Sequence, residues 1–381
     1  MTIEGPRGAR PDEIPAVVEL ADSVFRAGED ESMREEFPLL YGEENAEDLR
    51  IFLDDGRPVS LVAMFRREVV LAGTRHGSCA IGSVCTDPDY RGQGLATRLL
   101  KDAREQTVRD GGDIFLISGG RGLYTRQGYT DVGDYASCTV TQKRMPGGNL
   151  KVKAWTPDDV PQLVRLHSLE PTRFVRGPED FLALLKAERV VNAQADTRLV
   201  LDRDGRPVAY VTYRRPGSRR TEDDEIIIDE LAGSRAAIAQ ALPALFKEYD
   251  IRSITVNYLG GDAEMAALAR HHRWPTETGE FGGTVGIVEP ERFWSACEPL
   301  FRERLGKGFK CLSFRADDRI TIACGEEKLE LDGMEELTRL VFLPPHRRDE
   351  LKTGLPEDSH LRGVLDRLFP LPLVSYGLNY V

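Results

Sequence analysis

The stretch from residue 84 to residue 97 constrains this chain most, because it combines a strand, a glycine-rich turn and a helix. It reads Val84-Cys85-Thr86-Asp87-Pro88-Asp89-Tyr90-Arg91-Gly92-Gln93-Gly94-Leu95-Ala96-Thr97. The first turn of a helix has backbone N–H groups without helical partners, and the helix dipole adds positive potential there. Gly92 and Gly94 let a ligand approach the backbone, and Arg91 adds a positive charge. The segment therefore predicts a site for a phosphate or pyrophosphate group.

Two familiar nucleotide-binding motifs do not match this turn. The phosphate loop of NTPases requires Gly, four residues and then Gly-Lys-Ser/Thr, and the dinucleotide fingerprint requires GxGxxG. Here Gly92 and Gly94 are followed by Ala96-Thr97-Arg98. The order Arg-x-x-Gly-x-Ala, after Val-Cys-Thr-Asp-Pro, resembles the coenzyme A pyrophosphate loop of the GNAT acyltransferases. The alternative is a glycine-rich helix cap that binds no ligand.

The GNAT resemblance implies a set of residues around acyl-CoA. Main-chain groups of the strand before the loop pair with the pantetheine arm, and one of their N–H groups stabilises the developing oxyanion. The next strand, 114–117, leads into Ser118-Gly119-Gly120 beside the arm. The implied cofactor-binding residues are Val84, Cys85, Thr86, Arg91, Gly92, Gln93, Gly94, Leu95, Ala96, Thr97, Gly119 and Gly120. Cys85 has no neighbouring His or Lys to activate it, so we do not expect a cysteine nucleophile.

A tyrosine follows this strand, in Gly122-Leu123-Tyr124-Thr125-Arg126-Gln127-Gly128-Tyr129. GNAT enzymes carry a tyrosine at this place, and its hydroxyl protonates the leaving thiolate. By resemblance, Tyr124 is the catalytic acid. A phenol with an ordinary pKa near 10 is protonated at pH 7, which suits this role. The alternative is a packed aromatic side chain, which is what we expect of Tyr129.

The order of sequence signals restarts after a polar, glycine-rich linker at residues 143–149. Pro157-Asp158 opens a helical pattern as Pro11-Asp12 does. Asp204-Gly205-Arg206-Pro207 then repeats the hairpin signal of Asp55-Gly56-Arg57-Pro58. The same order of signals indicates a second copy of the first architecture. The alternative is that helix caps and hairpin turns simply look alike.

A third unit, with an amphipathic helix and short strands, begins near Val288. The expected fold class is α/β (α+β), with tandem GNAT-like domains that each have a mixed central sheet flanked by helices. The expected ranges are 1–145 for the catalytic domain, 151–287 for the second copy and 288–381 for the last domain. In the second copy Asp229-Glu230-Leu231-Ala232-Gly233 stands where the loop would fall, so we expect no second coenzyme A.

Two GNAT-like domains followed by a sterol-carrier-like domain are similar to the Eis (enhanced intracellular survival) type of N-acetyltransferase. The resemblance implies transfer of an acetyl group from acetyl-CoA to a primary amine by direct attack in a ternary complex. It also implies a homo-oligomer, a trimer or hexamer. In Eis-type enzymes the terminal carboxylate enters the cleft of the first domain as the base. Carried over, that base is the main-chain carboxylate of Val381, at the end of an apolar, aromatic tail.

The charge balance bears on the partners. The chain has 51 basic and 63 acidic residues, a net charge of −12, which argues against nucleic acid as a partner. Acidic groups gather at Glu29-Asp30-Glu31, Glu35-Glu36 and Glu43-Glu44, in the region that lines the acceptor side in GNAT folds. Carboxylates there attract a cationic acceptor such as an aminoglycoside, a polyamine or a lysine side chain. The alternative is a solvated acidic loop.

Other classes of protein fit the sequence less well. No apolar run approaches the ~18 residues of a spanning helix, and the N-terminus has no signal-peptide pattern. Six cysteines without a CxxC pair predict reduced, buried thiols in a cytoplasmic protein and no metal site. A lipid- or acyl-CoA-binding regulatory protein without transferase activity is the rival function, suggested by the sterol-carrier resemblance. The intact loop at 91–97 argues against lipid binding as the main role.

Overall fold

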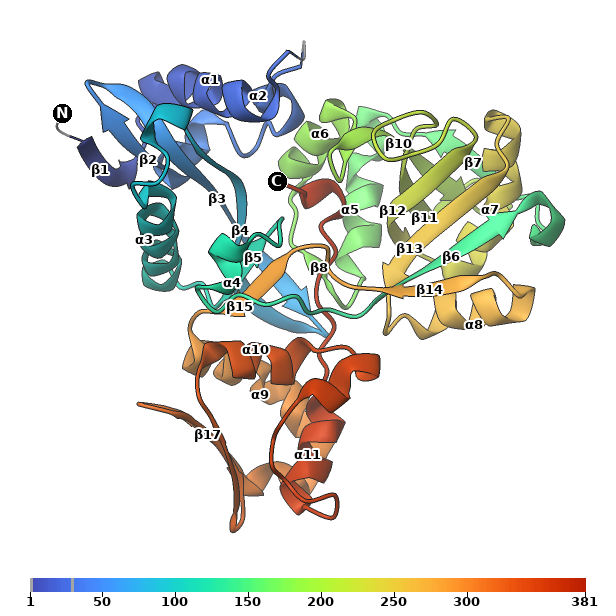
Figure 1. The fold of residues 1–381 in the computed structure, drawn as a ribbon. Coiled ribbons are helices and arrows are strands. Elements are labelled where there is room, and N and C mark those ends of the chain that lie inside the picture. Colours follow the sequence, from blue (N-terminus) through green and yellow to red (C-terminus); the bar gives the residue numbers. More distant parts are fainter. Residues whose placement is uncertain (1–2, 29–30) are drawn as a thin grey trace. The chain divides into compact units, whose positions relative to one another are not determined.

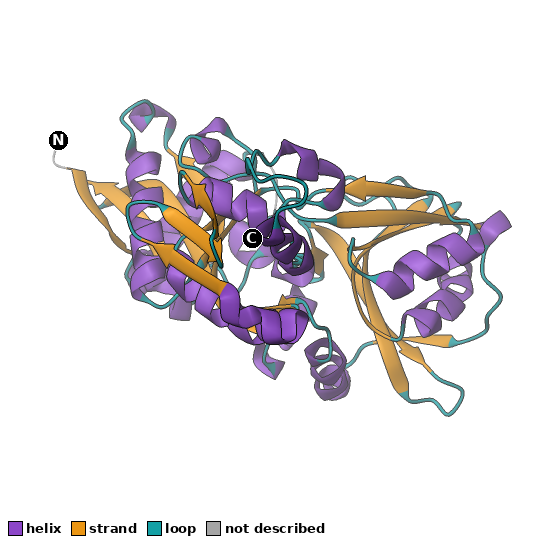
Figure 2. Ribbon diagram, turned by 90° about the horizontal axis from the view of Figure 1, so that it is seen from below, coloured by secondary structure: helices purple, strands orange, loops and turns teal. Residues whose placement is uncertain are grey.

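A computed structural model describes residues 3–28 and 31–381, which form two compact units (Figure 1). Unit 1 contains the described residues of 1–34, together with 40–133 and 280–373. Unit 2 contains residues 35–39, 134–279 and 374–381. The chain therefore passes repeatedly between the units and ends in unit 2. Each unit combines helices with strands, as the colours of Figure 2 show, so the predicted mixed α/β class is confirmed.

Unit 1 is built on a mixed sheet with the strand order β1-β2-β3-β4-β5-β15. Its strands are β1 (Ile3–Gly8), β2 (Leu49–Asp54), β3 (Arg57–Leu71), β4 (Thr74–Thr86), β5 (Ile114–Ile117) and β15 (Thr284–Ile287). Neighbouring strands are antiparallel except β4 and β5, which run parallel. Parallel neighbours need a crossover connection, and helix α3 (Leu95–Arg109) supplies it. The glycine-rich turn lies at the start of this crossover.

Helix α3 has one buried apolar face, as its sequence spacing predicts. Leu95, Leu99, Leu100 and Ala103 are all buried and recur at helical spacing. They pack in one cluster with side chains of the sheet, including Phe52, Val62, Met64, Ile81 and Phe115. This burial holds the helix on the sheet and positions its N-terminus beside the end of β4.

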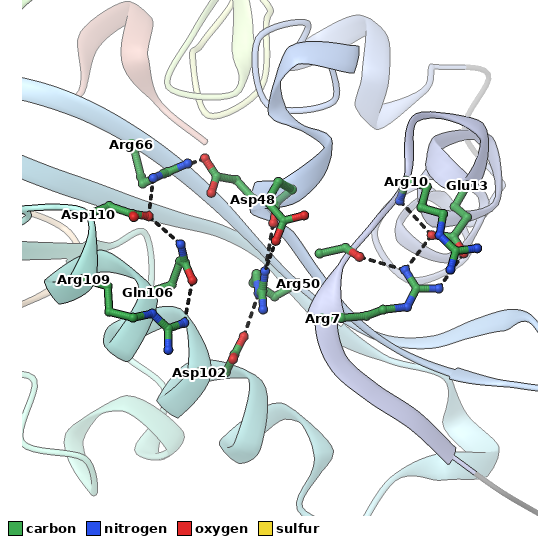
Figure 3. A network of polar contacts seen from close by, with 12 residues as sticks. Arg7, Arg10, Glu13, Asp48, Arg50, Arg66, Asp102, Gln106, Arg109 and Asp110 are labelled. Atoms are coloured by element: carbon green, nitrogen blue, oxygen red, sulfur yellow. Dashed lines mark hydrogen bonds and ion pairs between the residues drawn. The ribbon is translucent and has the colours of Figure 1, made fainter.

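Ion pairs hold the polar side of α3 (Figure 3). The guanidinium of Arg50 on β2, which is buried, donates to Asp102 of α3 at 2.6 Å. Arg66 on β3 bonds Asp48 at 2.8 Å and also Asp110, just after the helix. Partly buried pairs of this kind fix orientation more than they add stability. They tie both halves of α3 to the sheet.

The remaining N-terminal helices of unit 1 are α1 (Ile14–Phe25) and the single turns α2 (Met33–Glu36) and α4 (Gly122–Thr125). α2 lies where the chain passes from unit 1 to unit 2. α1 packs against β3 and β4 through Ile14, Val17, Val18 and Ala21. The helical pattern that Pro11-Asp12 opens is therefore present, with a 3₁₀ turn at Pro11–Glu13 before α1.

The C-terminal part of unit 1 is a three-stranded antiparallel sheet with helices. Its elements are α9 (Pro290–Leu305), β16 (Leu312–Ala316), β17 (Ile320–Cys324), β18 (Glu327–Leu331), α10 (Met334–Phe342) and α11 (His360–Leu368). α9 packs against β4, and α10 packs against β15. Trp294 of α9 stacks on Phe314 of β16 with ring centroids 4.4 Å apart. That this region is a sterol-carrier-like domain stays a prediction.

Two of the cysteines correct a prediction. Cys311 and Cys324 form a disulfide at the ends of β16 and β17, so the expectation that every cysteine is reduced is wrong for this pair. The two positions lie side by side because Leu312 pairs with Cys324 in the antiparallel register. Cys79, Cys85, Cys138 and Cys297 are free and buried, as expected.

Unit 2 repeats the plan of unit 1 with the strand order β14-β6-β13-β12-β11-β10-β7. Its strands are β6 (Tyr135–Thr141), β7 (Lys151–Ala154), β10 (Ala193–Leu201), β11 (Pro207–Arg214), β12 (Glu225–Gly233), β13 (Ser253–Leu259) and β14 (Thr276–Gly279), with the short β8 (Arg173–Phe174) and β9 (Arg189–Val190). Its helices are α5 (Val160–Ser168), α6 (Pro178–Ala187), α7 (Arg235–Glu248) and α8 (Ala263–His272). β12 and β13 are the parallel pair, joined by α7. Thus β10-β11-β12-α7-β13 corresponds to β2-β3-β4-α3-β5.

The units differ from the predicted ranges at two strands. β6 was expected in the first domain, yet it pairs with β13 and β14 in the sheet of unit 2. β15 was expected in the second domain, yet it pairs with β5 in the sheet of unit 1. The residues after 287 up to 373 belong to unit 1. A division into three domains at the predicted boundaries stays a prediction.

Candidate functional site

The end of β4 separates from β5 before the glycine-rich turn. Parallel pairing covers Ser78 to Ile81 of β4, and Ile81 lies opposite Ile117, the last residue of β5. β4 continues to Thr86 and stays paired with β3. Between these parts a β-bulge shifts the register, and Ser83 takes a left-handed backbone with φ of 47°. The bulge re-aims the strand, so an edge of β4 is open beside β5.

The turn after β4 is held by polar contacts around Asp87. Its backbone N–H donates to the Val59 carbonyl at 2.9 Å, and its carboxylate accepts the Asp89 N–H at 3.0 Å. Arg57 donates to the same carboxylate at 2.8 Å. The Asp89 N–H and the Arg57 guanidinium together lower the pKa of Asp87, so it remains an ionised cap. These contacts set the path of the chain into Arg91.

Gly92 and Gly94 have a backbone conformation that favours glycine, and the space beside both residues is open. Their φ angles are 79° and 73°, in the region that favours glycine, and a Cβ atom on either would meet nothing within 4 Å. The first helical bond of this turn runs from Arg98 N–H to the Gly94 carbonyl. The N–H groups of Leu95, Ala96 and Thr97 precede it in the first turn, where an α-helix leaves its donors without helical partners, and the three residues line the cavity described next.

A cavity of about 620 Å³ lies between the end of β4, the turn and the start of α3. This volume is in the range of small-molecule and cofactor sites. The predicted residues that line it are Val84, Cys85, Thr86, Arg91, Gly92, Gly94, Leu95, Ala96 and Thr97. The predicted Gln93, Gly119 and Gly120 are not part of this lining. The glycine-flanked helix start and the open strand edge thus belong to one cavity.

Sequence reasoning missed four further lining residues, Val24, Tyr90, Arg121 and Leu123. Arg121 carries a second positive charge into the cavity, and it stands directly before the segment that contains Tyr124. A cation next to two flexible glycines was the signal that identified Arg91, and it applies equally to Arg121. Val24 belongs to the C-terminal end of α1, and nothing in its local sequence distinguishes it.

Two reactive side chains were considered in this region, Cys85 and Tyr124. Cys85 is 5% exposed, and burial raises the pKa of its thiol to about 12, which leaves no thiolate at neutral pH. Tyr124 is also buried, and burial raises its pKa above the ordinary value, so its phenol is protonated. Gly119 lies against the Tyr124 ring, since a Cβ on Gly119 would lie 3.3 Å from it. Tyr124 thus lies at the exit of β5, and its role as the catalytic acid stays a prediction.

The other predicted groups fall into different parts of the chain. Val381 is buried within unit 2, and its role in catalysis stays a prediction. Glu35 and Glu36 belong to unit 2, whereas Glu43 and Glu44 belong to unit 1. Glu29 and Asp30 lie outside the described residues. The acidic acceptor side is therefore also a prediction.

The start of α7 in unit 2 differs from the start of α3. The Ser234 side chain accepts the Ala237 N–H at 3.2 Å, and the Glu170 carboxylate accepts the Gly233 N–H at 2.8 Å. Glu170 also pairs with Arg235 at 2.7 Å. The Ser234 side chain therefore takes one of the donors that an anion would need, and Glu170 holds a carboxylate beside the helix start.

Two other clusters contain side chains of the kinds that catalyse reactions or bind metals, but their surroundings do not suit either role. Cys297 Sγ lies 3.7 Å from His76 Nε2, and His76 Nδ1 lies 3.1 Å from Asp113. Cys297 and His76 are buried, and burial raises the pKa of Cys297, so this is a core contact. Cys311, Cys324 and His360 bring their ligand atoms within 4.8 Å of one another, but the two sulfurs are bonded together. Among the described residues, no helix is both long and apolar enough to cross a membrane.

Comparison with known proteins supports the same region of the chain. Residues 6–132 match the family model of the acetyltransferase (GNAT) domain. A search of curated proteins finds no match.

Solved structures of similar fold cover nearly the whole chain. A probable N-acyltransferase from Enterococcus faecalis aligns with a TM-score of 0.68 at 14% identity, over 98% of this chain and 99% of that one. A GCN5-related N-acetyltransferase from Anabaena variabilis gives 0.66 at 15% identity, over 98% and 99%. Eis1 from Mycobacterium abscessus gives 0.59 at 14% identity, over 97% of each chain. At these identities the structures establish the shared fold alone, and the similarity to the acetyltransferase (GNAT) domain covers residues 6–132.

Proposed function

We propose that this protein transfers an acetyl group from acetyl-CoA to a primary amine. One observation carries the proposal: the cavity of about 620 Å³ joins an open edge of β4 to the unobstructed N-terminus of α3. The helix N-terminus, Arg91 and Arg121 suit the pyrophosphate, and Gly92 and Gly94 give it room. The edge at Val84, Cys85 and Thr86 suits main-chain pairing with the pantetheine arm, as do Gly119 and Gly120 at the exit of β5.

The donor supplies a thioester whose carbonyl carbon is attacked by the neutral amine. A main-chain N–H near Cys85 stabilises the oxyanion, and the thiolate leaves when the tetrahedral species collapses. Tyr124 gives its phenolic proton to that thiolate, and the amine nitrogen gives up one proton to a base. The protonated, buried phenol supports this assignment. Direct attack needs no cysteine intermediate, in line with the inert thiol of Cys85.

We propose the terminal carboxylate of Val381 as the group that receives or holds the amine. Only the main chain of Val381 has acid–base chemistry, and an α-carboxylate with a pKa near 3.5 is ionised at pH 7. As a weak base it acts through position, either by relaying a proton through water or by holding the ammonium by charge. Adding two glycines after Val381 moves the charge and keeps every side chain. We expect kcat to collapse while acetyl-CoA affinity is unchanged; full turnover would exclude the carboxylate.

A cationic acceptor is the second part of the proposal. The acidic groups at 29–31, 35–36 and 43–44 support an aminoglycoside, a polyamine or a lysine side chain as substrate. Electrostatic attraction of a polycation weakens as the Debye length shrinks with salt. We expect kcat/KM for a polyamine to fall as ionic strength rises. A value independent of salt would contradict acceptor steering but not acyl transfer.

Titration calorimetry with acetyl-CoA tests the donor site directly. Gly94→Val puts a side chain into the open space at the helix start and should abolish binding. Gly73→Val is the matched control, because Gly73 also has positive φ and nothing within 4 Å of its Cβ position, but lies in the β3–β4 hairpin. Loss of binding in both variants, or in neither, would refute this donor site. A screen of amines by mass spectrometry would then identify the acceptor.

A second candidate function is acyl-CoA binding without transfer. The position of Tyr124 favours this second function, because Tyr124 is only 5% exposed and is not among the residues that line the cavity. Binding of acetyl-CoA without turnover on any amine would favour this second function. Assembly into a trimer or hexamer is also proposed, and light scattering that shows a 42.6 kDa particle would exclude it.

A further inference from the structure

The last eight residues of the chain are built into unit 2, unlike most chain ends. Val374, Tyr376, Leu378, Asn379 and Val381 are all at most 8% exposed. The Tyr135 hydroxyl donates to the Val374 carbonyl, and the Tyr376 ring stacks on Phe174 with centroids 6.2 Å apart. Chain termini usually fray unless contacts hold them. The terminal peptide therefore has a defined seat.

At the centre of this seat is a buried ion pair, Arg176 and Glu230. The guanidinium donates to both carboxylate oxygens at 2.7 Å, and the exposed fractions of the two side chains are 1% and 9%. Each partner also contacts the tail: Glu230 accepts the Leu378 N–H at 2.9 Å, and Arg176 Nε donates to the Asn379 side-chain oxygen. Burial alone would raise the pKa of Glu230, but Arg176 outweighs it and lowers the pKa to about 2. The pair is ionised at all physiological pH values.

A second layer fixes the ion pair. The Tyr210 hydroxyl donates to Glu230 at 2.7 Å and lies 3.0 Å from His167 Nδ1. His167 Nε2 donates to the Phe174 carbonyl at 2.8 Å. Buried polar groups are costly unless they are satisfied, and Arg176, Glu230 and the Tyr210 hydroxyl are satisfied mainly by one another and by the tail. The network thus has the tail as one of its partners.

The seat lies in the part of unit 2 that corresponds to the cavity of unit 1. Parallel pairing of β12 with β13 ends at Ile228, as that of β4 with β5 ends at Ile81. Glu230 is two residues beyond Ile228, and Ser83 is two residues beyond Ile81. Both strands have a register shift at this place. The strand that borders the donor cavity in one unit therefore receives the C-terminal peptide in the other.

We propose that Arg176 and Glu230 are positioning residues, which seat the chain's own C-terminal peptide so that its terminal carboxylate is held for acyl transfer. This inference rests on the proposed function, in which that carboxylate acts. The residues themselves touch the tail and not the reacting atoms. Their effect is transmitted through residues 377–381, which are too few to take up a large displacement.

Gly377 offers a way to unseat the tail without altering the ion pair. Its φ is 48°, and a Cβ atom there would lie 2.1 Å from the Glu230 carboxylate. Gly377→Ala therefore drives the peptide away from Glu230. Gly205→Ala is the matched control in the same unit, because Gly205 has φ of 81° and a Cβ would meet nothing within 4 Å. Both variants carry a similar backbone strain, but only one carries a clash with the seat.

Carboxypeptidase Y on the full-length chain measures the seat independently of activity. A buried terminus is cleaved only when it opens, so we expect Gly377→Ala to release valine about tenfold faster than wild type or more. We expect kcat to fall about 100-fold, the scale of an ångström misplacement, with the dissociation constant for acetyl-CoA unchanged. Gly205→Ala should match wild type in all three measurements.

A second pair of variants removes a contact without adding bulk. Asn379→Ala removes the tail's partner for Arg176 and should repeat both effects of Gly377→Ala in weaker form. Asn257→Ala is its control, because Asn257 donates at 2.9 Å to Asp229, which forms the neighbouring buried pair with Arg214 and does not contact the tail. Melting curves establish that all four variants fold.

The outcomes separate the proposals. Unchanged valine release from Gly377→Ala and Asn379→Ala overturns the seat. Faster release with unchanged kcat overturns its role in transfer. If wild type binds acetyl-CoA but acetylates no amine, the proposed function itself fails, and that result appears in the wild-type assay before any variant is compared.

Discussion

Replacing His167 with a residue that does not titrate should reduce the loss of unfolding free energy that unit 2 suffers at acidic pH. Burial, reinforced by the neighbouring Arg176, lowers the pKa of His167 from 6.5 to about 3. A group whose pKa is lower in the folded state contributes stability above its unfolded pKa and loses that contribution as pH falls towards the folded value. His167 therefore destabilises the folded unit progressively from pH 6.5 down to pH 3. Gln in its place keeps a donor and an acceptor but does not titrate.

The magnitude follows from the two pKa values. At pH 4.5 the unfolded histidine is protonated and the folded one is not, which costs about 3 kcal/mol of unfolding free energy relative to pH 7.5. With a urea m-value of about 2 kcal/mol/M, the midpoint of wild type should fall by about 1.5 M more than that of His167→Gln. Glu230 adds little in this window, because its pKa is about 2 when folded and near 4.5 when unfolded. Its contribution is lost only below pH 4.5.

Tryptophan fluorescence can follow this unit in a Trp294→Phe background, which leaves Trp155 and Trp274 as reporters in unit 2. Urea titrations at pH 7.5, 6.0 and 4.5 are compared between that background and the same chain with His167→Gln. Parallel loss of stability in both would refute the reasoning. It would mean that His167 is charged in the folded unit and donates from Nδ1 to the Tyr210 oxygen, so that hydrogen bonding outweighs burial.

Three further predictions follow from single side chains. Replacing Cys311 and Cys324 with serine opens a loop between residues 13 apart, so the urea unfolding free energy of unit 1 should fall by about 3 kcal/mol, and an equal stability with and without dithiothreitol in wild type would contradict this. Cys85→Ser should keep at least half of kcat, because burial raises the thiol pKa to about 12 and leaves no thiolate to attack. A variant that folds and binds acetyl-CoA but has no activity would instead support Cys85 as a nucleophile. Tyr124→Phe should lower kcat about 100-fold, and an unaffected kcat in this variant would exclude Tyr124 as the acid. Because burial raises the pKa of Tyr124, we expect the kcat of wild type to show no loss from deprotonation of this phenol up to its ordinary pKa near 10.

The glycine-rich turn and the helix that follows it were predictable because their features are local in sequence. The turn, both glycines, Arg91 and the helix start lie within seven residues, and backbone rules alone relate them to an anion. The apolar spacing of α3 was equally local. The positive φ angles of Gly92 and Gly94 agree with the reason given for glycine there. Features that are determined by neighbouring residues were therefore predicted correctly from the sequence.

The seat of the tail was not predictable in detail, because it joins residues far apart in the chain. Glu230 lies 54 residues from Arg176 and 148 from Leu378, and Arg176 lies 203 from Asn379. No neighbouring pattern distinguishes a buried arginine from a surface one. The apolar, aromatic tail indicated that something holds it, but not which side chains do so. The same holds for β6 and β15, whose partners are set by pairing across the sheet and not by their own sequences.

The disulfide shows a different limit. Cysteine count and spacing were used to infer a compartment, whereas the bond depends on which positions the hairpin places side by side. Leu312 opposite Cys324 brings Cys311 within 4.7 Å between Cα atoms, a distance that permits a bridge. The register of the hairpin, and not the spacing of the cysteines in the sequence, places these two positions together.

The two units use one structural device for two purposes. In each, a strand leaves its parallel partner just before a register shift and then leads into a helix. In unit 1 the helix start is kept open by glycines, and the freed strand edge borders a cavity that suits the donor. In unit 2 the Ser234 side chain caps the helix, Glu170 accepts the Gly233 N–H just before it, and Glu230 on the freed strand binds the main chain of the tail at Leu378. A strand end suited to pairing with an extended arm is thus equally suited to pairing with an extended peptide. Loss of the loop in unit 2 leaves that place for the protein's own terminus.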